Sequence, residues 1–287
     1  MELESDAFQD VDASLFRDRE FQLFRELIYA KSGIFLGPYK RTRMFWKLGR
    51  RMREVGVDTF RDYYDYVLER GEPEIHSLLE SICTHETRFF REPVQMQYFS
   101  EQVIPELQRE KGEHRNVKIW SAGCSSGEEP YSLAMLLLDR LPVAQRWQHS
   151  VWATDLSRPV LQKAREGLWA IEKSQEIPFS LLQTYMLRGI GSHQGLFTAG
   201  RELRSVITFD VLNLNDEVYP VTEPFDVIFC RNVLIYFSTE SRARVVDRLL
   251  RHLVPGGFLF LGHTKTLQQH PRVTRSPVPA VYRVLRG

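Results

Sequence analysis

The sequence predicts an α/β protein in which a mainly parallel sheet follows an all-helical region and is interrupted by a small insert. Apolar residues recur at helical spacing from residue 14 to about 110, and from residue 117 short β-rich runs alternate with helical stretches. Between about 171 and 207 a glycine-rich segment breaks this alternation and is too long for a simple connection. We therefore expect a helical domain over 14–110 and an α/β domain over 113–287, with the hydrophilic stretch 109–113 as linker.

The helical domain is predicted from apolar side chains that share one helix face and from breaks at glycine and proline. Ser32-Gly33, Gly37-Pro38 and Gly71-Glu72-Pro73 mark the breaks. The apolar positions are Phe16, Phe21, Phe24, Leu27 and Ile28, then Phe60, Tyr63, Tyr64 and Val67, and later Met96, Phe99, Val103 and Leu107.

One predicted helix combines an apolar stripe with a cationic arc. Residues 40–53 hold seven Lys or Arg and no acid, although the net charge of the whole chain is +1. A solvated face is the usual explanation, and nucleic-acid binding is the function that such a pattern first suggests. The stripe consists of Met44, Phe45, Leu48, Met52 and Val55, and the arc of Lys40, Arg43, Lys47, Arg50, Arg51 and Arg53.

The strands of the α/β domain are predicted from short apolar, β-rich runs. The last run is most simply a closing strand, and the glycine-rich segment is expected to form a small hairpin or lobe. The runs are VKIW (117–120), SVWATD (150–155), VITFDV (206–211), FDVIFC (225–230), GGFLFLG (256–262) and AVYRVL (280–285).

Composition excludes several classes of protein. The chain is 43% hydrophobic and 26% charged, as in ordinary globular proteins. Cys83, Cys124 and Cys230 are far apart and form no C-x-x-C pair, which argues against a disulfide framework or a zinc site and fits a reducing cytosol. A pairing of Cys83 with His85 would supply only two ligands, so we expect no metal. No apolar run approaches a membrane span and no signal-peptide pattern is present, so we expect a cytoplasmic protein without membrane insertion.

The stretch IWSAGCSSGEEPYSLA (119–134) allows two chemistries and one purely structural interpretation. Gly123-Cys124-Ser125-Ser126-Gly127 fits the G-x-S-x-G elbow of serine hydrolases, and Asp226 and His263 could complete a triad in the right order. However, the strand before Ser125 is the first of the α/β domain, and no HGGG-type oxyanion segment exists. The same small-residue turn can instead bring backbone close to a cofactor, or simply join a strand to a helix.

Three acids favour a cofactor without phosphates. Glu128 and Glu129 open the helix after the turn, where carboxylates would repel a pyrophosphate, although acidic capping of a first turn is also common. Asp155 ends a second apolar strand, where a carboxylate typically accepts hydrogen bonds from ribose hydroxyls; alternatively it caps the next helix. A nucleoside with a cationic sulfonium and an amino-acid tail meets these conditions, and S-adenosylmethionine is that molecule.

Four segments make the prediction specific. THETRFFREP (84–93), SAGCSSGEEPYS (121–132), ATDLSRPVLQKAREGLW (153–169) and FDVIFCRNVLIYF (225–237) resemble, in order and spacing, the chemotaxis receptor methyltransferases of the CheR family. The resemblance extends from about residue 15 to 285. It implies a helical N-terminal domain, then a Rossmann-like, class I methyltransferase domain with a β-subdomain insert. It also implies methyl transfer from S-adenosylmethionine to glutamates of chemoreceptors during chemotactic adaptation, with S-adenosylhomocysteine as the product.

The resemblance also assigns site residues. We expect Arg91 and Tyr236 to complete the catalytic site, Arg91 by holding a carboxylate and Tyr236 by orienting the accepting oxygen. His85 stands where relatives often carry Asn. We therefore expect this position to contact the cofactor, but we do not derive that contact from the histidine side chain. The residues expected to bind the cofactor are His85, Thr87, Arg91, Gly123, Glu128, Glu129, Asp155, Asn213, Leu214, Arg231 and Asn232.

The expected substrate is an anionic protein side chain and not a nucleic acid. A glutamate is ionised at neutral pH, so its methylation needs no strong general base. Enzymes that methylate exocyclic amines carry a motif such as D-P-P-Y after the fourth strand, whereas this chain has Arg231-Asn232-Val233-Leu234 there. A positive residue such as Arg231 facing the acceptor suits an anionic substrate better. Two alternatives stay open: a serine hydrolase that uses Ser125, and a noncatalytic adaptor that keeps the fold.

Two surfaces are expected to bind receptors. Chemoreceptor adaptation regions are acidic helical bundles, so the cationic arc, with Lys47, Arg50, Arg51 and Arg53, is expected to steer the enzyme onto them. Some relatives also pair a C-terminal receptor peptide against the β-subdomain, and the segment 188–195 resembles the longer loop of those members.

Overall fold

A computed structural model of the chain describes residues 16–262, 267 and 270–286. The chain divides into two units: a helical unit made of residues up to Thr84 together with Tyr236–Ser241, and an α/β unit made of His85–Ile235 and Arg242–Gly287. The division at Thr84 corrects the expected linker at 109–113. Helical spacing in 93–111 does not reveal what the apolar face packs on, and its buried side chains belong to the core of the α/β unit.

The helical unit is built around aromatic side chains. Phe16 packs on Phe60 with ring centroids 4.5 Å apart, and Phe24 stacks on Tyr63 at 5.6 Å. Glycines at left-handed positions end the first two α-helices, since Gly33 and Gly56 have φ of 70° and 73°. The helices are α1 (Asp18–Ser32), η2 (Pro38–Lys40), α2 (Arg41–Val55), α3 (Phe60–Arg70) and α4 (Glu72–Ile82).

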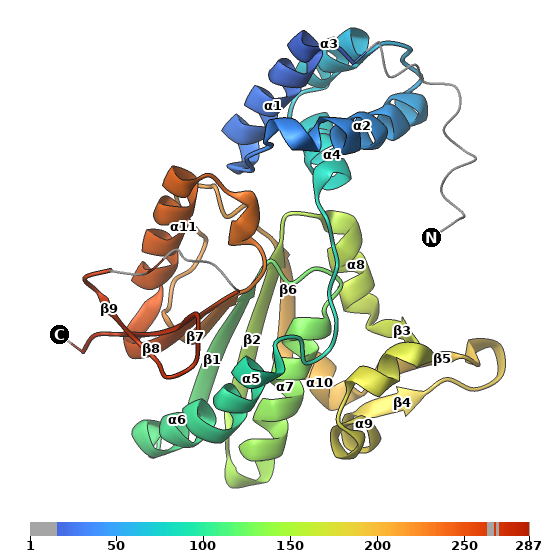
Figure 1. Ribbon diagram of the computed structural model, residues 1–287. Helices are drawn as coiled ribbons and strands as arrows, with labels where there is room; N and C mark the ends of the chain where they lie inside the picture. The colour runs from blue at the N-terminus through green and yellow to red at the C-terminus, as the bar shows by residue number, and fades with distance from the viewer. Residues whose placement is uncertain (1–15, 263–266, 268–269, 287) are drawn as a thin grey trace. The chain divides into compact units, whose positions relative to one another are not determined.

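The α/β unit contains a sheet with the order β6-β2-β1-β7-β8-β10-β9 (Figure 1). Strands β6, β2, β1, β7 and β8 pair in parallel, and β10 joins β8 and β9 in antiparallel register. This confirms the predicted mainly parallel sheet and its closing strand. The strands are β1 (Asn116–Ala122), β2 (Gln148–Asp155), β6 (Ile207–Val211), β7 (Phe225–Cys230), β8 (Leu253–Leu261), β9 (Val273–Arg275) and β10 (Val281–Val284).

Alternating side chains of the strands bury both faces of this sheet. On one face Ile119 joins a core that includes the helices before and after β1. On the other face Trp120 packs against Trp152 and Phe225, with ring centroids 4.9 and 5.6 Å away. The helices outside the insert are α5 (Pro93–Tyr98), the π-helical η3 (Phe99–Val103), α6 (Ile104–Lys111), α7 (Glu128–Arg140), η4 (Val143–Gln145), α8 (Arg158–Glu166), α10 (Arg201–Val206), η7 (Leu234–Tyr236) and α11 (Thr239–Arg251).

The insert forms a second sheet of order β3-β5-β4, with antiparallel pairing throughout. Its first strand begins three residues before the predicted insert. The glycine-rich segment forms the connection from β4 to β5, where a Cβ on Gly189 would lie 2.1 Å from the carbonyl oxygen of His193. The elements are β3 (Leu168–Ala170), η5 (Ile171–Glu176), α9 (Phe179–Tyr185), β4 (Met186–Arg188), η6 (Gly191–His193) and β5 (Leu196–Ala199).

Within the described residues, no helix combines the length and the apolar character needed to cross a bilayer.

Candidate cofactor site

The order of strands reverses at β1, which lies between β2 and β7. Chain order runs from β1 through β2 to β6 on one side, and from β7 to β8 on the other. In open parallel sheets, ligands bind outside the carboxyl ends of the strands at such a switch point. The segments that follow β1, β2, β6 and β7 are those that carry most of the predicted cofactor residues.

The turn after β1 requires glycine. The N–H groups of Gly123 and Cys124 donate to the carbonyl of Thr154 at 2.7 and 2.9 Å, which ties the turn to β2. Gly123 has φ of 80°, and a Cβ there would lie 2.3 Å from Cγ2 of Val233. Ser125 also has a positive φ, 51°. The turn is therefore a tight cradle of backbone between the ends of β1, β2 and β7.

The two acids after the turn are buried and internally paired. Glu129 accepts from the hydroxyl of Ser121 at 2.6 Å and from Nε of Arg231 at 2.7 Å. Glu128, with no exposed surface, accepts from the hydroxyl of Ser126 at 2.7 Å and forms an ion pair with Lys173. Because cations within the α/β unit balance both carboxylates, their repulsion of a pyrophosphate is weaker than the sequence suggested.

Asp155 lies at the end of β2 and joins two neighbouring segments. One carboxylate oxygen accepts from the N–H of Ser125 at 2.9 Å, and the other from the N–H of Ser157, the residue before α8, at 3.0 Å. A carboxylate has about four acceptor positions, so these two bonds leave room for hydroxyl donors. Asp155 thus supports the turn after β1 and holds the residue before α8, and it stays able to bind a ligand.

The residues after β7 close the site from the other side of β1. The side chain of Arg231 is buried, and besides Glu129 it donates to the carbonyl of Arg91 at 2.6 Å. Its charge therefore acts inside the fold, which corrects the expectation that it faces an anionic acceptor. Asn232 has φ of 58°, and its buried Oδ1 has no hydrogen-bond partner in the described part of the chain.

The segment 85–92 packs beside the turn. The carbonyl of His85 accepts from the hydroxyl of Ser125 at 3.1 Å, so the backbone of this position contacts the turn. Thr87 is half-buried. The guanidinium of Arg91 donates to the carbonyl of Glu86 at 2.8 Å, and its other N–H groups leave it able to hold a carboxylate.

Asn213 and Leu214 follow β6 at the same edge of the sheet. The pairing of Asp155 with Val211 and the bond from the N–H of Leu212 to the carbonyl of Asp155, 3.0 Å long, bring the segment after β6 beside the end of β2. The side-chain oxygen of Asn213 accepts from the N–H of Asn215 at 2.9 Å, which shapes the turn there.

The serine hydrolase alternative is wrong on geometric grounds. Asp226 lies at the start of β7, where it accepts from the N–H of Lys118 at 2.9 Å, whereas Ser125 lies beyond the other end of β1. The four residue steps from Lys118 to Ala122 alone span about 13 Å of strand. His263 lies outside the described residues. Asp226 therefore cannot join Ser125 in a triad.

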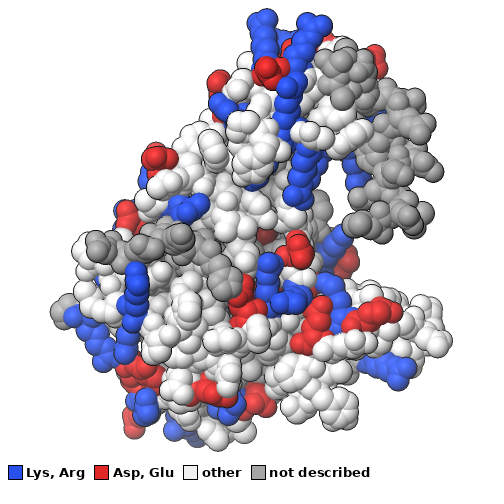
Figure 2. Space-filling model, in the orientation of Figure 1, with Lys and Arg blue, Asp and Glu red and all other residues white. Residues whose placement is uncertain are grey.

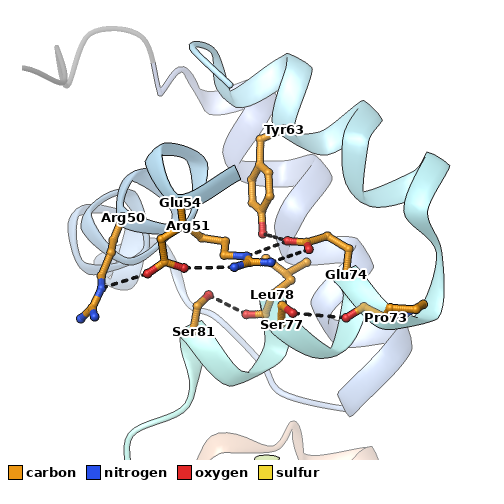
Figure 3. Close-up of polar contacts among 9 residues, drawn as sticks. All are labelled: Arg50, Arg51, Glu54, Tyr63, Pro73, Glu74, Ser77, Leu78 and Ser81. Carbon is orange, nitrogen blue, oxygen red and sulfur yellow. Dashed lines mark hydrogen bonds and ion pairs between the residues drawn. The ribbon is translucent and has the colours of Figure 1, made fainter. Parts of the chain in front are cut away.

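The predicted catalytic residue Tyr236 and the predicted receptor-binding residues lie in the helical unit and meet partners there. Tyr236 belongs to this unit, where Lys40 lies over its ring at 5.4 Å from the centroid. Arg51 binds the buried Glu74 through two nitrogens, at 2.9 and 2.7 Å, and Tyr63 adds a bond of 3.0 Å (Figure 3). Lys47 donates to the carbonyls of Ile82 and Cys83 at the end of α4.

Several residues that build the site carried no signal in the sequence. Lys173 and Glu176, both on η5, contact Glu128 and the N–H of Phe89, respectively. The hydroxyl of Ser132 links Phe90 to α7, because it accepts from the N–H of Phe90 at 3.0 Å and donates to the carbonyl of Glu128 at 2.6 Å. Such contacts join residues far apart in the chain and leave no local pattern.

The site fits S-adenosylmethionine. The unpartnered, buried oxygen of Asn232 can accept from an ammonium group, and Asp155 can accept from ribose hydroxyls. This combination at the switch point of a parallel sheet defines a Rossmann-like methyltransferase that uses S-adenosylmethionine.

Comparisons with known proteins identify the family. The protein-family model described as "CheR methyltransferase, SAM binding domain" matches residues 85–279, and the family model described as "CheR methyltransferase, all-alpha domain" matches residues 19–83. The chemotaxis protein methyltransferase of Escherichia coli (strain K12) is 38% identical over 89% of this chain and 87% of the relative. That of Salmonella typhimurium (strain LT2) is 37% identical over 86% of this chain and 84% of the relative. The chain belongs to the CheR methyltransferase family.

Similarity to solved structures is weaker. A methyltransferase from Geobacter sulfurreducens in complex with S-adenosylhomocysteine matches 62% of this chain and 51% of that chain, with 13% identity and a TM-score of 0.34. The family assignment rests on the sequence relatives. The protein is a methyltransferase of chemotaxis that depends on S-adenosylmethionine.

Proposed function

We propose that the protein transfers the methyl group of S-adenosylmethionine to glutamate side chains of chemoreceptors, which gives glutamyl methyl esters and S-adenosylhomocysteine. The observation that carries this proposal is the similarity to curated chemotaxis protein methyltransferases over nearly the whole chain. The names of these relatives imply a chemotaxis protein as substrate. The proposal places the enzyme in the cytoplasm, beside the adaptation helices of the receptors.

The reaction is a single displacement. S-adenosylmethionine supplies a methyl group bonded to positively charged sulfur. A glutamate oxygen forms a bond to the methyl carbon while the carbon–sulfur bond breaks, and the electron pair of that bond stays on sulfur. No proton moves, because the glutamate is already ionised at neutral pH. The protein therefore needs to align the two partners and exclude water rather than supply a base.

The predicted cofactor residues are proposed to bind different parts of S-adenosylmethionine. Asp155 would accept from the ribose hydroxyls, and Asn232 would accept from the amino group of S-adenosylmethionine. Arg91 holds a carboxylate, either that of the cofactor or that of the substrate. Glu129 and Arg231 support these contacts from within, since their ion pair at 2.7 Å joins α7 to the segment after β7.

Tyr236 is proposed to orient the accepting glutamate oxygen through its hydroxyl. Its ring lies near Lys40, and its carbonyl accepts from the N–H of Phe35 at 2.7 Å, so contacts within the helical unit hold its backbone. Tyr236→Phe tests this role. We expect a lower kcat with unchanged affinity for S-adenosylhomocysteine, and an unchanged kcat would contradict it.

The cationic face of α2 is proposed to bind the acidic helices of the receptor. Figure 2 shows Lys and Arg side chains gathered on the visible face of the helical unit. The side chain of Arg50 is 75% exposed even though it pairs with Glu54, and Arg53 is also exposed. The side chain of Arg51 is only 24% exposed and lies against the buried Glu74, and Lys47 donates to backbone carbonyls of the unit. We therefore assign receptor steering to Arg50 and Arg53.

Reversal of both charges tests this assignment. Arg50→Glu with Arg53→Glu should slow methylation of receptor membranes at low salt, and the difference from wild type should shrink as salt rises. Arg61→Glu with Arg70→Glu, on α3, serves as the control of equal charge. Equal rates for both double variants at low salt would exclude α2 as the receptor surface.

A receptor tail peptide is proposed to dock on the insert. Strand β4 pairs with β5 along one side and forms an edge of its sheet, where Leu187 and Ile190 are 58% and 82% exposed. An extended peptide can add to such an edge and place apolar side chains on it. Titration with a C-terminal receptor peptide should give saturable binding that Leu187→Asp weakens, and absence of binding by wild type would exclude it.

The decisive experiment is methyl transfer from labelled S-adenosylmethionine to receptor-containing membranes. Base-labile methyl esters on receptor glutamates would support the proposal. Binding of S-adenosylhomocysteine without any transfer would instead support the noncatalytic adaptor.

A further inference from the structure

A short helix of the insert, η5, contacts the cofactor site. Helix η5 follows edge strand β3 and carries two charged residues that reach different parts of the site. Lys173 forms an ion pair with Glu128 at the end of the glycine turn. Glu176 accepts from the N–H of Phe89, at 2.7 Å, in the segment that also carries Thr87 and Arg91.

Lys173 compensates a buried charge. The Glu128 carboxylate is fully buried, and a buried carboxylate is stable only when it is paired and hydrogen-bonded. The side chain of Lys173 is 36% exposed, so it reaches inward from the surface along its aliphatic stem. Without it, Glu128 would have to bind a proton or move toward water, and the turn that precedes it would move as well.

Glu176 and the aromatic rings of the insert hold the segment 85–92. Phe89 is buried against Trp169 and Phe197, with ring centroids 5.0 and 6.0 Å away. Next to it, Phe90 and Glu92 have φ of 50° and 58°. Such left-handed conformations of residues other than glycine persist only where the surroundings hold them. The insert supplies part of that support from one side.

We propose that Lys173 and Glu176 are positioning residues of the cofactor site. Through them the insert supports both the glycine turn and the segment 85–92, in addition to any role in docking. Lys173 fixes the turn through Glu128, and Glu176 fixes the segment that presents Thr87 and Arg91. This inference rests on the assignment of S-adenosylmethionine as cofactor. It adds two residues, outside the recognised motifs, whose loss should weaken cofactor binding without their touching the cofactor.

Calorimetric titration of the full chain with S-adenosylhomocysteine tests the proposal. Lys173→Met and Glu176→Ala should each raise Kd on the order of tenfold, the equivalent of one charge-assisted hydrogen bond. Lys173→Arg and Glu176→Gln keep the donor and the acceptor and should restore most of the affinity. Glu172→Ala, on the same helix, and Lys163→Met, on α8, are exposed controls that should bind as wild type does.

Hydrogen exchange of the ligand-free protein separates positioning from general stability. In Glu176→Ala the amide of Phe89 should exchange faster, while strand β7 keeps its protection and the thermal midpoint stays near that of Glu172→Ala. If Lys173→Met does not fold, Glu176→Ala and its Gln counterpart decide the matter. Control-like Kd values for both substitutions would overturn the proposal, whereas failure of wild type to bind would overturn the cofactor assignment itself.

Discussion

Replacement of Arg51 should destabilise the helical unit far more than replacement of its neighbour Arg50. The Glu74 carboxylate, 6% exposed, receives two bonds from Arg51 and one from Tyr63 (Figure 3). Arg51→Met removes the cation and leaves a buried carboxylate with a single neutral donor. Arg50 pairs with Glu54 on the exposed surface of the same helix, so Arg50→Met is a matched control.

The expected magnitude follows from burial. Breaking a buried pair by removing one partner costs about 3–5 kcal/mol, whereas an exposed i,i+4 pair contributes about 0.3–0.5 kcal/mol. Since the side chain of Arg51 is 24% exposed, water can replace part of the lost contact, so we expect about 2–3 kcal/mol. For a unit of this size, each kcal/mol lowers the midpoint of unfolding by about 4–8 °C.

Scanning calorimetry of the full chain measures the difference between the two variants. The transition of the helical unit should move down by about 8–24 °C in Arg51→Met and by less than about 4 °C in Arg50→Met. Adding Glu74→Leu to Arg51→Met should recover part of the loss, because the uncompensated charge is then gone. Equal midpoints for the two single variants would refute the assignment of Arg51 to a stabilising network.

Three further predictions concern the site and the same network. Asp155→Ala should raise the Kd for S-adenosylhomocysteine at least about tenfold by calorimetry, since charge-assisted bonds are lost, while the exposed Asp139→Ala should not. The Ser125→Ala variant should retain methyl-transfer activity, and a serine-reactive fluorophosphonate should not label the wild-type protein. Labelling at Ser125 would support the serine hydrolase alternative instead. Burial and the Glu74 carboxylate raise the pKa of Tyr63, so the folded unit keeps the phenol neutral above about pH 10, where the unfolded chain ionises it. Stability should therefore fall as pH rises through that range, and Tyr63→Phe should flatten the fall in urea titrations.

The strands of the sheet could be predicted because both faces are buried. Strands such as β7 are buried along their whole length and appear in sequence as continuous apolar runs bounded by polar residues. The division between the units could not be predicted in the same way. The spacing of Met96, Phe99, Val103 and Leu107 predicts a helix correctly, but it holds equally for packing on other helices or on a sheet, so residues 93–111 were assigned to the wrong neighbour.

The turn and its acids could be located from sequence, because short-range chemistry requires them. Gly123 is needed where the chain turns at positive φ against Val233, and Asp155 ends a strand beside that turn. The backbone contact of His85 and the support from Ser132 could not be located, because both depend on how distant segments pack.

Charged residues show the limit of sequence reasoning most clearly. Glu129 and Arg231 are separated by 102 positions, Glu128 and Lys173 by 45, and Arg51 and Glu74 by 23, yet each pair lies within hydrogen-bonding distance.

A run of like charges or an acid at a helix start indicates where charge is placed, but not whether a partner within the fold already balances it. From sequence, Arg51 and Arg231 are expected to face external anions, whereas in the fold each is paired with a buried carboxylate. Once those pairs are set aside, the cations best placed to meet a ligand or partner are the exposed Arg50 and Arg53 on α2 and the half-buried Arg91 beside the turn. Substitutions there should alter binding, whereas substitutions at Arg51 and Arg231, which are bound to buried carboxylates, should first alter the fold.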